Sequence, residues 1–352
     1  MKKLLIIAPY QFGELSDCYY WAKYATLEGW NVTYLGYRYH QREIKERSCP
    51  GGRVVGVKHS KNRLIHGLKF LGTIIKEIIV HNHRNVIVCR FPKCELLPKL
   101  FPNRNIVLDV RTLSVAPNEL EREAADNQLR RIMKSFKITS VISKGVCEKL
   151  GGGCPILPLG AEPLSMVAKN FNSLRLFYIG TFNNRNLSQF IEGLALYQKR
   201  TCDSNVTFDV VGGGSDSEVQ MIKDTIAKTG VKGVELHGYL THEEAQPYFD
   251  KCNVGVCYVP VTDYYQHQPP TKLYEYLLSG MACIATNTFS NLEVMNNSNG
   301  IVICDNSESI AEGLRDLKYS LSNYQSDIIV SSAQEYHWKS IVENSLFPIF
   351  GL

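Results

Sequence analysis

Residues 206–229 read VTFDVVGGGSDSEVQMIKDTIAKT, an apolar run, three glycines and a periodic stretch in direct succession. The apolar run predicts a buried strand over Val206–Val211, and the periodic stretch predicts a helix over Ser217–Thr229. A glycine turn between a buried strand and a helix is typical of parallel sheets whose crossover helices cover both faces. This stretch therefore places the chain in the α/β class.

The same alternation extends through both halves of the chain. In the first half it predicts strands at Leu4–Ala8, Val32–Leu35, Val86–Cys89, Ile106–Val110 and Ser140–Ile142, and helices at Ser16–Glu28 and Glu119–Phe136. In the second half it adds strands at Leu174–Ile179, Val234–Leu236, Val254–Tyr258 and Ala282–Ala285, and helices at Leu187–Lys199, Glu243–Lys251 and Lys272–Ser279. We therefore expect two Rossmann-like, doubly wound sheets in series, with ligands bound where strands lead into helices.

The length of 352 residues is too great for one hydrophobic core and predicts two domains. Residues 155–172 contain three prolines and no long period, which places the linker there and the domains at 1–165 and 166–334. Residues 1–160 contain 26 Lys and Arg against 13 Asp and Glu, a balance of +13, whereas residues 161–352 contain 13 against 21, a balance of −8. Opposite charges predict that the two domains meet different partners.

The composition excludes several classes of protein. With 44% hydrophobic and 21% charged residues, the chain is typical of globular rather than disordered proteins. No apolar run approaches the ~18–20 residues of a membrane-spanning helix. The run Leu4–Ala8, ended by Pro9, is too short for a signal peptide. The eleven cysteines form no C-x-x-C pair, which predicts free thiols, a cytoplasmic setting and no zinc site.

Two of the predicted strand-to-helix junctions carry glycines. Gly13 follows the first strand, and Gly212 opens the Gly212–Gly214 run; glycine lets the backbone approach a ligand closely. Neither loop has the third glycine of a dinucleotide fingerprint, which disfavours an NAD-dependent oxidoreductase. A plain turn explains Gly13 equally well, and a glycine-rich turn with a Ser or Asp helix cap explains Gly212 equally well.

Two further junctions carry positive charge. The loop Gly180–Leu187 offers Arg185, which can grip a phosphate through two parallel hydrogen bonds, although a solvated loop Arg is the plainer alternative. Residues 267–286 read HQPPTKLYEYLLSGMACIAT, in which two prolines precede a helix that begins at Thr271 or Lys272. The Lys272 ammonium and the free N–H groups of that helix form a candidate anion site.

The carboxylate of Glu275 lies one turn further along the same helix face as Lys272. A carboxylate there would repel phosphate, so its expected partner is a neutral diol such as a ribose. The alternative is a capped helix with a Lys–Glu pair three residues apart, a pair that contributes only ~0.3–0.5 kcal/mol.

These stretches together resemble the retaining glycosyltransferases of family 4, the group 1 type with the GT-B fold. In the second half the resemblance rests on Phe177–Gly180, Phe208–Gly214, Val234–Leu240, Tyr248–Pro260 and Lys272–Thr286. In the first half it rests on Val141–Ser143 and Leu157–Ala161, and at the end on Trp338 and the tail to Phe350. The resemblance implies two Rossmann-like domains facing a central cleft, with the C-terminal helix 335–352 crossing back to the first domain.

The resemblance also implies a donor-binding role for particular residues. Glu275 matches the second of two family glutamates and would hold the donor ribose, whereas the position of the first is occupied by His267. Either His267, Gln266 or Gln268 would then take over the contacts of that first glutamate with the donor sugar, or the donor differs from the family's common ones. Arg185 and Lys272 correspond to the basic pair that binds the diphosphate. The other donor-binding residues implied are Gly13, Gly180, Gly212, Tyr239, Leu240, Thr271 and Leu273.

The implied reaction transfers a sugar from a UDP- or GDP-sugar to an acceptor hydroxyl, with retention of the anomeric configuration. The sequence lacks a D-x-D triplet, so we expect no metal and no cofactor, with Arg185 and Lys272 stabilising the departing diphosphate. Acceptor-side groups are expected from the first domain: Asp109 and Arg111 as catalytic candidates and Arg90 as an acceptor contact. Each of these three can instead form an ion pair between strands.

The segment 58–80 predicts a contact with an anionic membrane. Its apolar residues Leu64, Leu68, Leu71, Ile75 and Ile78 recur with helical spacing, opposite His66, Lys69, Thr73 and Lys76. Such a helix suits an acceptor carried on a lipid at the inner face of the plasma membrane, and each basic residue near the surface contributes ~1 kcal/mol. A helix packed on the sheet explains the pattern equally well. Nucleic acid is a poorer partner, because the basic stretch has no interleaved aromatic residues.

The sequence thus predicts a glycosyltransferase of cell-surface polysaccharide biosynthesis. His267 in the place of a glutamate keeps a second interpretation open, a non-catalytic GT-B protein that binds sugar nucleotides. A GT-B epimerase or phosphorylase is a third interpretation, disfavoured by the Pro-Pro-Thr-Lys pattern at residues 269–272.

Overall fold

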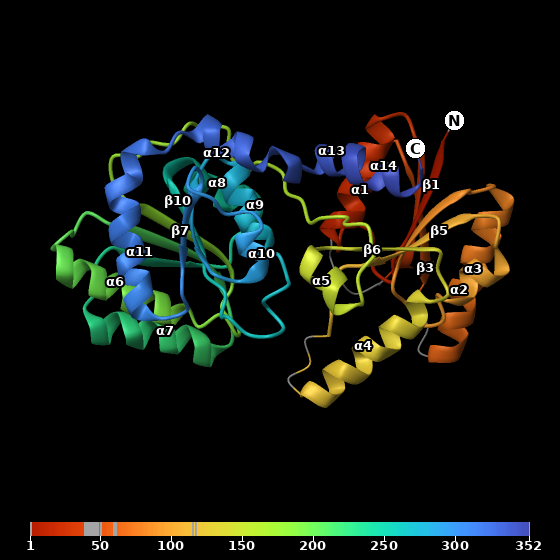
Figure 1. The fold of residues 1–352 in the computed structure, drawn as a ribbon, viewed down its shortest axis with the longest axis horizontal. Helices are drawn as coiled ribbons and strands as arrows, with labels where there is room; N and C mark the ends of the chain where they lie inside the picture. The colour runs from red at the N-terminus through yellow and green to blue at the C-terminus, as the bar shows by residue number, and fades with distance from the viewer. Residues whose placement is uncertain are drawn as a thin grey trace. The chain divides into compact units, whose positions relative to one another are not determined.

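The computed structural model describes residues 2–38, 49, 51–58, 62–114, 116 and 118–351. The chain divides into two compact units, Met1–Leu159 with Trp338–Leu352, and Gly160–His337 (Figure 1). It changes unit at 159/160 and 337/338 instead of at the predicted 165/166 and 334/335. The reason is local pairing, since Ala161 forms a β-bridge with His337 and its N–H donates to the Tyr336 carbonyl at 3.0 Å.

The first unit is built on a six-stranded sheet in the order β3-β2-β1-β4-β5-β6, in which every neighbouring pair is parallel. The strands are β1 (Lys3–Ile7), β2 (Asn31–Arg38), β3 (Arg53–Lys58), β4 (Asn85–Cys89), β5 (Asn105–Val110) and β6 (Ile138–Val141). The five predicted strands are confirmed. The edge strand β3 was not predicted, because most of its residues are exposed and it lacks a continuous apolar run.

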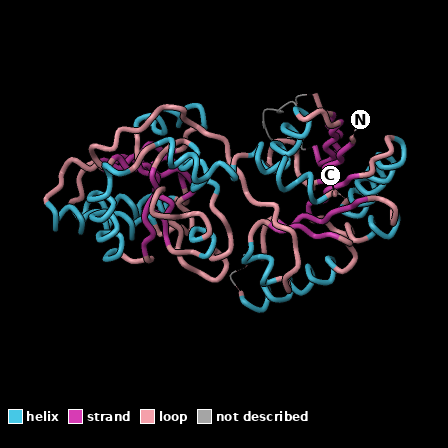
Figure 2. Tube along the Cα trace, turned by 45° about the horizontal axis from the view of Figure 1, so that its top comes forward, coloured by secondary structure: helices cyan, strands magenta, loops and turns pink. Residues whose placement is uncertain are grey.

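Helices flank this sheet, as the cyan and magenta segments of Figure 2 show. They are α1 (Ser16–Leu27), α2 (Arg63–Val80), α3 (Leu96–Leu100), α4 (Glu119–Met133) and α5 (Lys144–Lys149). The C-terminal tail adds α13 (Trp338–Ile341), a π-helical turn η3 (Val342–Leu346) and α14 (Phe347–Ile349). The tail is joined to the unit by stacked rings: Trp338 lies on Tyr20 with centroids 5.3 Å apart, and Phe347 lies on Trp30 at 4.6 Å.

The second unit contains another six-stranded parallel sheet, in the order β12-β11-β10-β7-β8-β9. Its strands are β7 (Arg175–Thr181), β8 (Thr207–Gly213), β9 (Val234–Gly238), β10 (Val254–Cys257), β11 (Ala282–Thr286) and β12 (Gly300–Ile303). The predicted strands are confirmed, and the short edge strand β12 is additional. The two sheets confirm the predicted α/β class.

The helical segments of the second unit follow these strands. They are α6 (Leu187–Thr201), α7 (Asp216–Thr229), α8 (His242–Lys251), α9 (Thr271–Leu278), α10 (Phe289–Leu292), α11 (Ser307–Ser320), η1 (Leu321–Asn323), α12 (Ser326–Ala333) and η2 (Gln334–Tyr336). The strand order reverses at β7, which has β8 on one side and β10 on the other. The carboxyl ends of these strands therefore form the switch point where open α/β sheets bind ligands.

Helix α2 packs on its unit through a face that overlaps the predicted apolar face only at Ile78. His66, Phe70, Ile74 and Ile78 are buried. Leu64 and Leu68, by contrast, are 79% and 71% exposed. Aromatic contacts select this face, because the Phe70 ring lies 4.5 Å from Tyr37 and 5.2 Å from Phe91. Of the basic stretch that precedes the helix, residues 59–61 lie outside the described residues.

Two further expectations concern the whole chain. All eleven cysteines are free thiols, as predicted. Among the described residues, no helix combines the length and the apolar character that crossing a membrane requires.

We predict opposite outcomes for two substitutions on α2. Phe70→Ala should lower the free energy of unfolding by about 3–5 kcal/mol, because it empties a fully buried aromatic site. Leu68→Ala should change it by less than about 0.5 kcal/mol, because this side chain is largely exposed. Denaturant unfolding of the two variants measures both values, and similar losses would contradict the assignment of the buried face.

Candidate functional site

A pocket of about 680 Å³ lies in the second unit, at the carboxyl ends of β7 and β8 and in front of α9. Eight of the predicted site residues line it: Gly180, Arg185, Gly212, Tyr239, Leu240, Thr271, Lys272 and Glu275. Side chains from four separate strand-to-helix junctions therefore meet at one place. The parallel register of the sheet brings them together, because it aligns the ends of neighbouring strands.

Two paired glycines form the floor of this pocket. Gly180 and Gly212 are register partners in β7 and β8, with φ of +145° and +140°, a region that side chains rarely adopt. A Cβ atom on Gly212 would lie 1.8 Å from the Gly180 carbonyl oxygen. Close packing therefore requires glycine at Gly212, and Ser215 caps the helix that follows, as the alternative of a glycine-rich turn with a helix cap predicted.

The amine of Lys272 lies next to this floor, 3.4 Å from the position that a Cβ on Gly180 would occupy. Its Nζ lies 3.6 Å from the centre of the Tyr178 ring, is buried, and has no hydrogen-bond partner. Burial lowers the pKa of this amine to about 7, with a further lowering by the Arg185 guanidinium and opposing effects from Cys257 and Glu275. A buried amine without a partner is poised to receive an anion.

Arg185 supplies the second positive charge. Its guanidinium lies over the Tyr265 ring at 4.4 Å, and its Nη1 donates to the Asn184 carbonyl at 3.5 Å. The turn that presents it needs left-handed residues, which Asn184 and Asn186 provide with φ of 56° and 48°. Asn residues tolerate this conformation better than most others, which explains the asparagine-rich loop.

Helix α9 begins at the pocket without a side-chain cap, since Pro270 occupies the N-cap position. Thr271 and Lys272 stand at its first turn, where backbone N–H groups attract anions. Leu273 differs from the prediction, because its side chain is completely buried in the core and does not line the pocket. Its place in the helix pattern is explained by packing.

The carboxylate of Glu275 lies in the same pocket. Its side chain is 16% exposed, and Oε1 lies 3.7 Å from Nε2 of His242, which also lines the pocket. The pocket thus joins two basic side chains, Arg185 and Lys272, to one carboxylate. That combination can hold an anionic group and a neutral hydroxyl-bearing group side by side.

The position of the family's first glutamate is clarified by the neighbours of His267. The His267 ring stacks on Phe289 with centroids 5.2 Å apart, and His267 is not among the residues that line the pocket. The Gln266 side chain accepts a hydrogen bond from the Phe289 N–H at 3.1 Å. Gln268 does line the pocket. Of the three predicted substitutes, Gln268 is therefore the one placed to meet a ligand.

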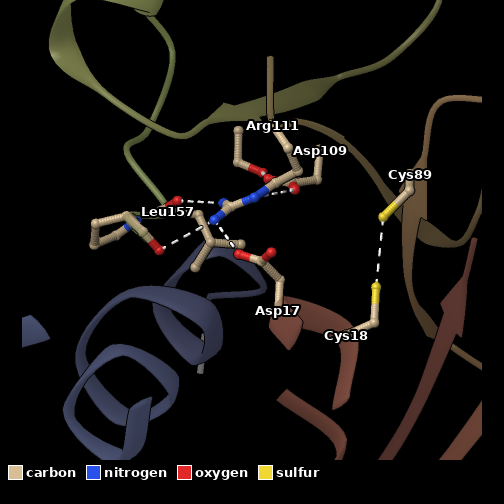
Figure 3. A network of polar contacts seen from close by, with 8 residues as sticks. Asp17, Cys18, Cys89, Asp109, Arg111 and Leu157 are labelled. Carbon is tan, nitrogen blue, oxygen red and sulfur yellow. Dashed lines mark hydrogen bonds and ion pairs between the residues drawn. The ribbon is translucent and has the colours of Figure 1, made fainter. Parts of the chain in front are cut away.

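Asp109 and Arg111, predicted as catalytic, belong to a buried ion cluster in the first unit (Figure 3). Arg111 donates to Asp17 of α1 and to the Leu157 carbonyl at 2.6 Å, and its Nε lies 3.7 Å from Asp109 Oδ2. Burial raises the pKa of Asp109 to about 6, against the lowering effects of Arg111 and of the Ser140 hydroxyl bond. These contacts favour the ion-pair alternative over a catalytic role.

The other predicted residues of the first unit are more exposed. Arg90 donates from Nη2 to Gln128 Oε1 at 3.3 Å on the surface. Gly13 has φ of +93°, which explains the glycine by backbone conformation alone.

One group of possible metal ligands occurs within the described ranges. Asp209, Glu235 and His237 place ligand atoms within 4.8 Å of one another. The Asp209 carboxylate already receives the Lys251 ammonium at 3.0 Å and lies 2.8 Å from His237 Nε2. None of the three lines the pocket, so we interpret the group as an ion cluster within the sheet.

Sequence reasoning missed several residues that line the pocket. They are Ile179, Thr181, Val211, Gly213, Thr241, His242, Val259 and Tyr265. His242 had a local signal, because it lies between Thr241 and Glu244, the two residues of the capping box that starts α8. Tyr265 had none, because its loop has no periodic pattern and only the fold brings its ring to Arg185.

Comparison with known proteins identifies the domain that carries this pocket. Residues 173–318 match the family model described as Glycosyl transferases group 1, and this range contains every residue that lines the pocket. No curated protein matches the chain in sequence.

Solved structures confirm the GT-B fold. Sucrose-phosphate synthase from Thermosynechococcus elongatus matches with a TM-score of 0.75 at 15% identity, covering 100% of this chain and 98% of its own. HepE from Anabaena, in complex with UDP and glucose, matches with 0.72 at 12% identity, covering 100% of both chains. The lipopolysaccharide outer core galactosyltransferase WaaB matches with 0.70 at 13% identity, covering 99% of both. At these identities the likeness concerns the fold alone.

We predict that the glycine floor tolerates no side chain at Gly212. Gly212→Ala should lower the free energy of unfolding by at least about 2 kcal/mol, because the methyl group collides with the Gly180 carbonyl. Gly213→Ala is the matched control, since nothing lies within 4 Å of its Cβ position, and should change it by less than about 0.5 kcal/mol. Thermal or denaturant unfolding measures the stability of both variants. Equal stability would refute the requirement for glycine at Gly212.

Proposed function

We propose that this chain, whose residues 173–318 form a group 1 glycosyltransferase domain within a GT-B fold, moves a sugar from a UDP- or GDP-sugar to the hydroxyl of a glycan or lipid-linked acceptor. The observation that carries the proposal is the charge arrangement of the pocket. Lys272, Arg185 and the start of α9 supply positive charge, and Glu275 supplies a carboxylate, around a floor of glycine backbone.

In this proposal the donor occupies the pocket with its diphosphate at Lys272 and Arg185. Glycines at the floor let the phosphates approach the backbone, and the helix start offers N–H donors. The ribose hydroxyls would be held by Glu275, with Gln268 near the donor sugar. Tyr239 and Leu240 would lie next to the base. The HepE structure from Anabaena with UDP and glucose makes UDP the first nucleotide to test.

The proposed chemistry is electrostatic. The bond between the anomeric carbon and the diphosphate oxygen breaks, and a bond from that carbon to the acceptor oxygen forms on the same face of the sugar. The acceptor proton passes to the leaving phosphate, so no side-chain nucleophile is needed. Arg185 and Lys272 stabilise the negative charge that grows on the diphosphate. The proposal includes no metal and no other cofactor, and activity should persist in excess EDTA.

We further propose that the acceptor belongs to cell-surface polysaccharide biosynthesis, on the cytoplasmic side of the membrane. Support comes from α2, which leaves Leu64, Ile65 and Leu68 exposed beside Lys69 and Lys76. Exposed apolar residues next to lysines match the interface of an anionic bilayer, where apolar groups insert and cations remain at the head groups. A lipid-linked acceptor would be reached from that position.

Turnover of the pocket variants tests the enzymatic proposal. Lys272→Ala should lower kcat about 100- to 1000-fold, the usual effect of removing one charged contact from the transition state. Glu275→Gln should mainly weaken donor binding, because its carboxylate contacts the ribose in both ground and transition states. The exposed Lys223 of α7 provides the control, and Lys223→Ala should leave turnover unchanged.

Two measurements are needed. Turnover is measured as the release of UDP or GDP from sugar donors, and nucleotide binding is measured as the shift in unfolding temperature that free UDP or GDP causes. Nucleotide binding with equal, background-level turnover in wild type and both pocket variants would support the non-catalytic alternative. No stabilisation by either nucleotide would overturn the assignment of the pocket.

Membrane contact is tested with vesicles. A Leu64→Ser, Leu68→Ser double variant should bind phosphatidylglycerol vesicles at least about tenfold more weakly, since each buried Leu contributes ~1.5–3 kcal/mol. Met166 is 89% exposed in the second unit, and Met166→Ser is the control that should bind as wild type does. Sedimentation with vesicles gives both affinities. Equal binding by the double variant, or none by wild type, would rule out this contact.

A further inference from the structure

Lys272 lies in a chemical environment that ordinary surface lysines lack. Its Nζ lies 3.6 Å from the centre of the Tyr178 ring and 3.4 Å from the position that a Cβ on Gly180 would occupy. The amine is buried and has no hydrogen-bond partner, and Tyr178 beneath it is completely buried. Within the described part of the chain, the ring face is the one group that supports a positive charge at this point by direct contact.

The groups around the amine do not form an ion pair with it. Tyr178 comes from β7, Cys257 from β10, Arg185 from the loop after β7, and Glu275 from the next turn of α9. The charge of Arg185 opposes a proton on Lys272, whereas Glu275 and a Cys257 thiolate would favour one. Burial raises the pKa of Cys257 to about 12, so this thiol is neutral at ordinary pH and contributes no charge.

Without a ligand, desolvation is therefore the largest influence on the protonation state of Lys272. A buried ammonium without hydrogen-bond acceptors is unfavourable, and the amine lowers its energy by releasing the proton. An incoming diphosphate reverses this balance, because it brings negative charge and several acceptor oxygens to the same point. The empty and the occupied pocket thus favour different protonation states of one side chain.

We propose that Lys272 takes up a proton from solvent as the donor diphosphate binds, and that Tyr178 is the positioning residue whose ring holds the amine in place. This inference rests on the proposed function, since it concerns the same diphosphate. The step is a simple protonation, in which the neutral amine gains one proton and the resulting ammonium donates hydrogen bonds to the diphosphate. No other bond changes.

The proposal fixes the direction of the pH dependence. Burial leaves the pKa of Lys272 at about 7 in the empty pocket, and the diphosphate raises it. Below pH 7 the lysine already carries its proton, and donor affinity does not change through this group. Above pH 7 each binding event must bring one proton, so the Kd rises up to tenfold per pH unit.

Tyr178 has two separable roles. Its ring face lies under Lys272, and its hydroxyl donates to the Thr181 carbonyl at 2.7 Å, at the end of β7. Tyr178→Phe removes the hydroxyl and keeps the ring. Replacement of Tyr178 by 3,5-difluorophenylalanine keeps the shape of that Phe variant and weakens the electrostatic attraction of the ring for a cation. The comparison between these two variants isolates the ring from the packing.

The number of protons taken up on binding is measured by titration calorimetry with UDP at pH 8, in buffers of different ionisation enthalpy. Free UDP is fully ionised there, and a Lys272 amine with a pKa near 7 is mostly neutral. Wild type should therefore take up close to one proton for each UDP bound. Lys272→Arg, which is charged at every pH used, should bind UDP with uptake near zero.

The two variants of Tyr178 test the positioning role. In Tyr178→Phe the Kd of UDP should begin to rise at the same pH as in wild type. In the difluorophenylalanine variant the rise should begin up to about 1 pH unit lower, because the ring supports the cation less well. Thermal unfolding of both variants checks that the fold is retained.

The outcomes distinguish this inference from the proposed function. If neither UDP nor GDP binds, the proposed function itself fails. If UDP binds with no proton uptake by wild type, or with equal uptake by Lys272→Arg, the protonation of Lys272 is refuted while the donor pocket stands. If the pH dependence is the same in both Tyr178 variants, the ring has no positioning role.

Discussion

The close approach of Gly180 and Gly212 is the constraint on which the functional pocket depends. The two residues are register partners at the carboxyl ends of β7 and β8, and a single methyl group on Gly212 would collide with the Gly180 carbonyl. Their shared backbone surface leaves the switch point of the sheet open to a ligand. The Lys272 Nζ lies beside it, 3.4 Å from the position that a Cβ on Gly180 would occupy.

Basic side chains contact different kinds of partner in the two units. In the first unit Arg111 forms ion pairs with Asp17 and Asp109 and donates to the carbonyls of Leu157 and Pro158, so its charge holds the end of that unit together. In the second unit Lys272 and Arg185 lie against aromatic rings instead of carboxylates. A ring does not neutralise a cation as a carboxylate does, so Arg185 keeps its charge and Lys272 can take up a proton when an anion binds.

The amphipathic helix α2 illustrates why a pattern alone is ambiguous. Leu64 and Leu68 repeat with helical spacing as well as Phe70 and Ile74 do, and the helix has apolar residues on more than one side. The choice of face is made by the rings of Tyr37 and Phe91 from other parts of the chain. Local periodicity therefore predicts the helix and leaves open which of its faces packs on the unit.

The sequence by itself determined the α/β class, the order of the strands and helices, and eight of the residues that line the pocket. Apolar runs, glycine turns and the Pro-Pro-Thr-Lys helix start are local patterns, which can be recognised in a single sequence. Only the tertiary structure decided that Gln268 instead of His267 lines the pocket, that Tyr265 meets Arg185, and that β3 and β12 complete the sheets. These features depend on which segments the fold brings together, and the desolvation of Lys272 depends on every neighbour that covers it.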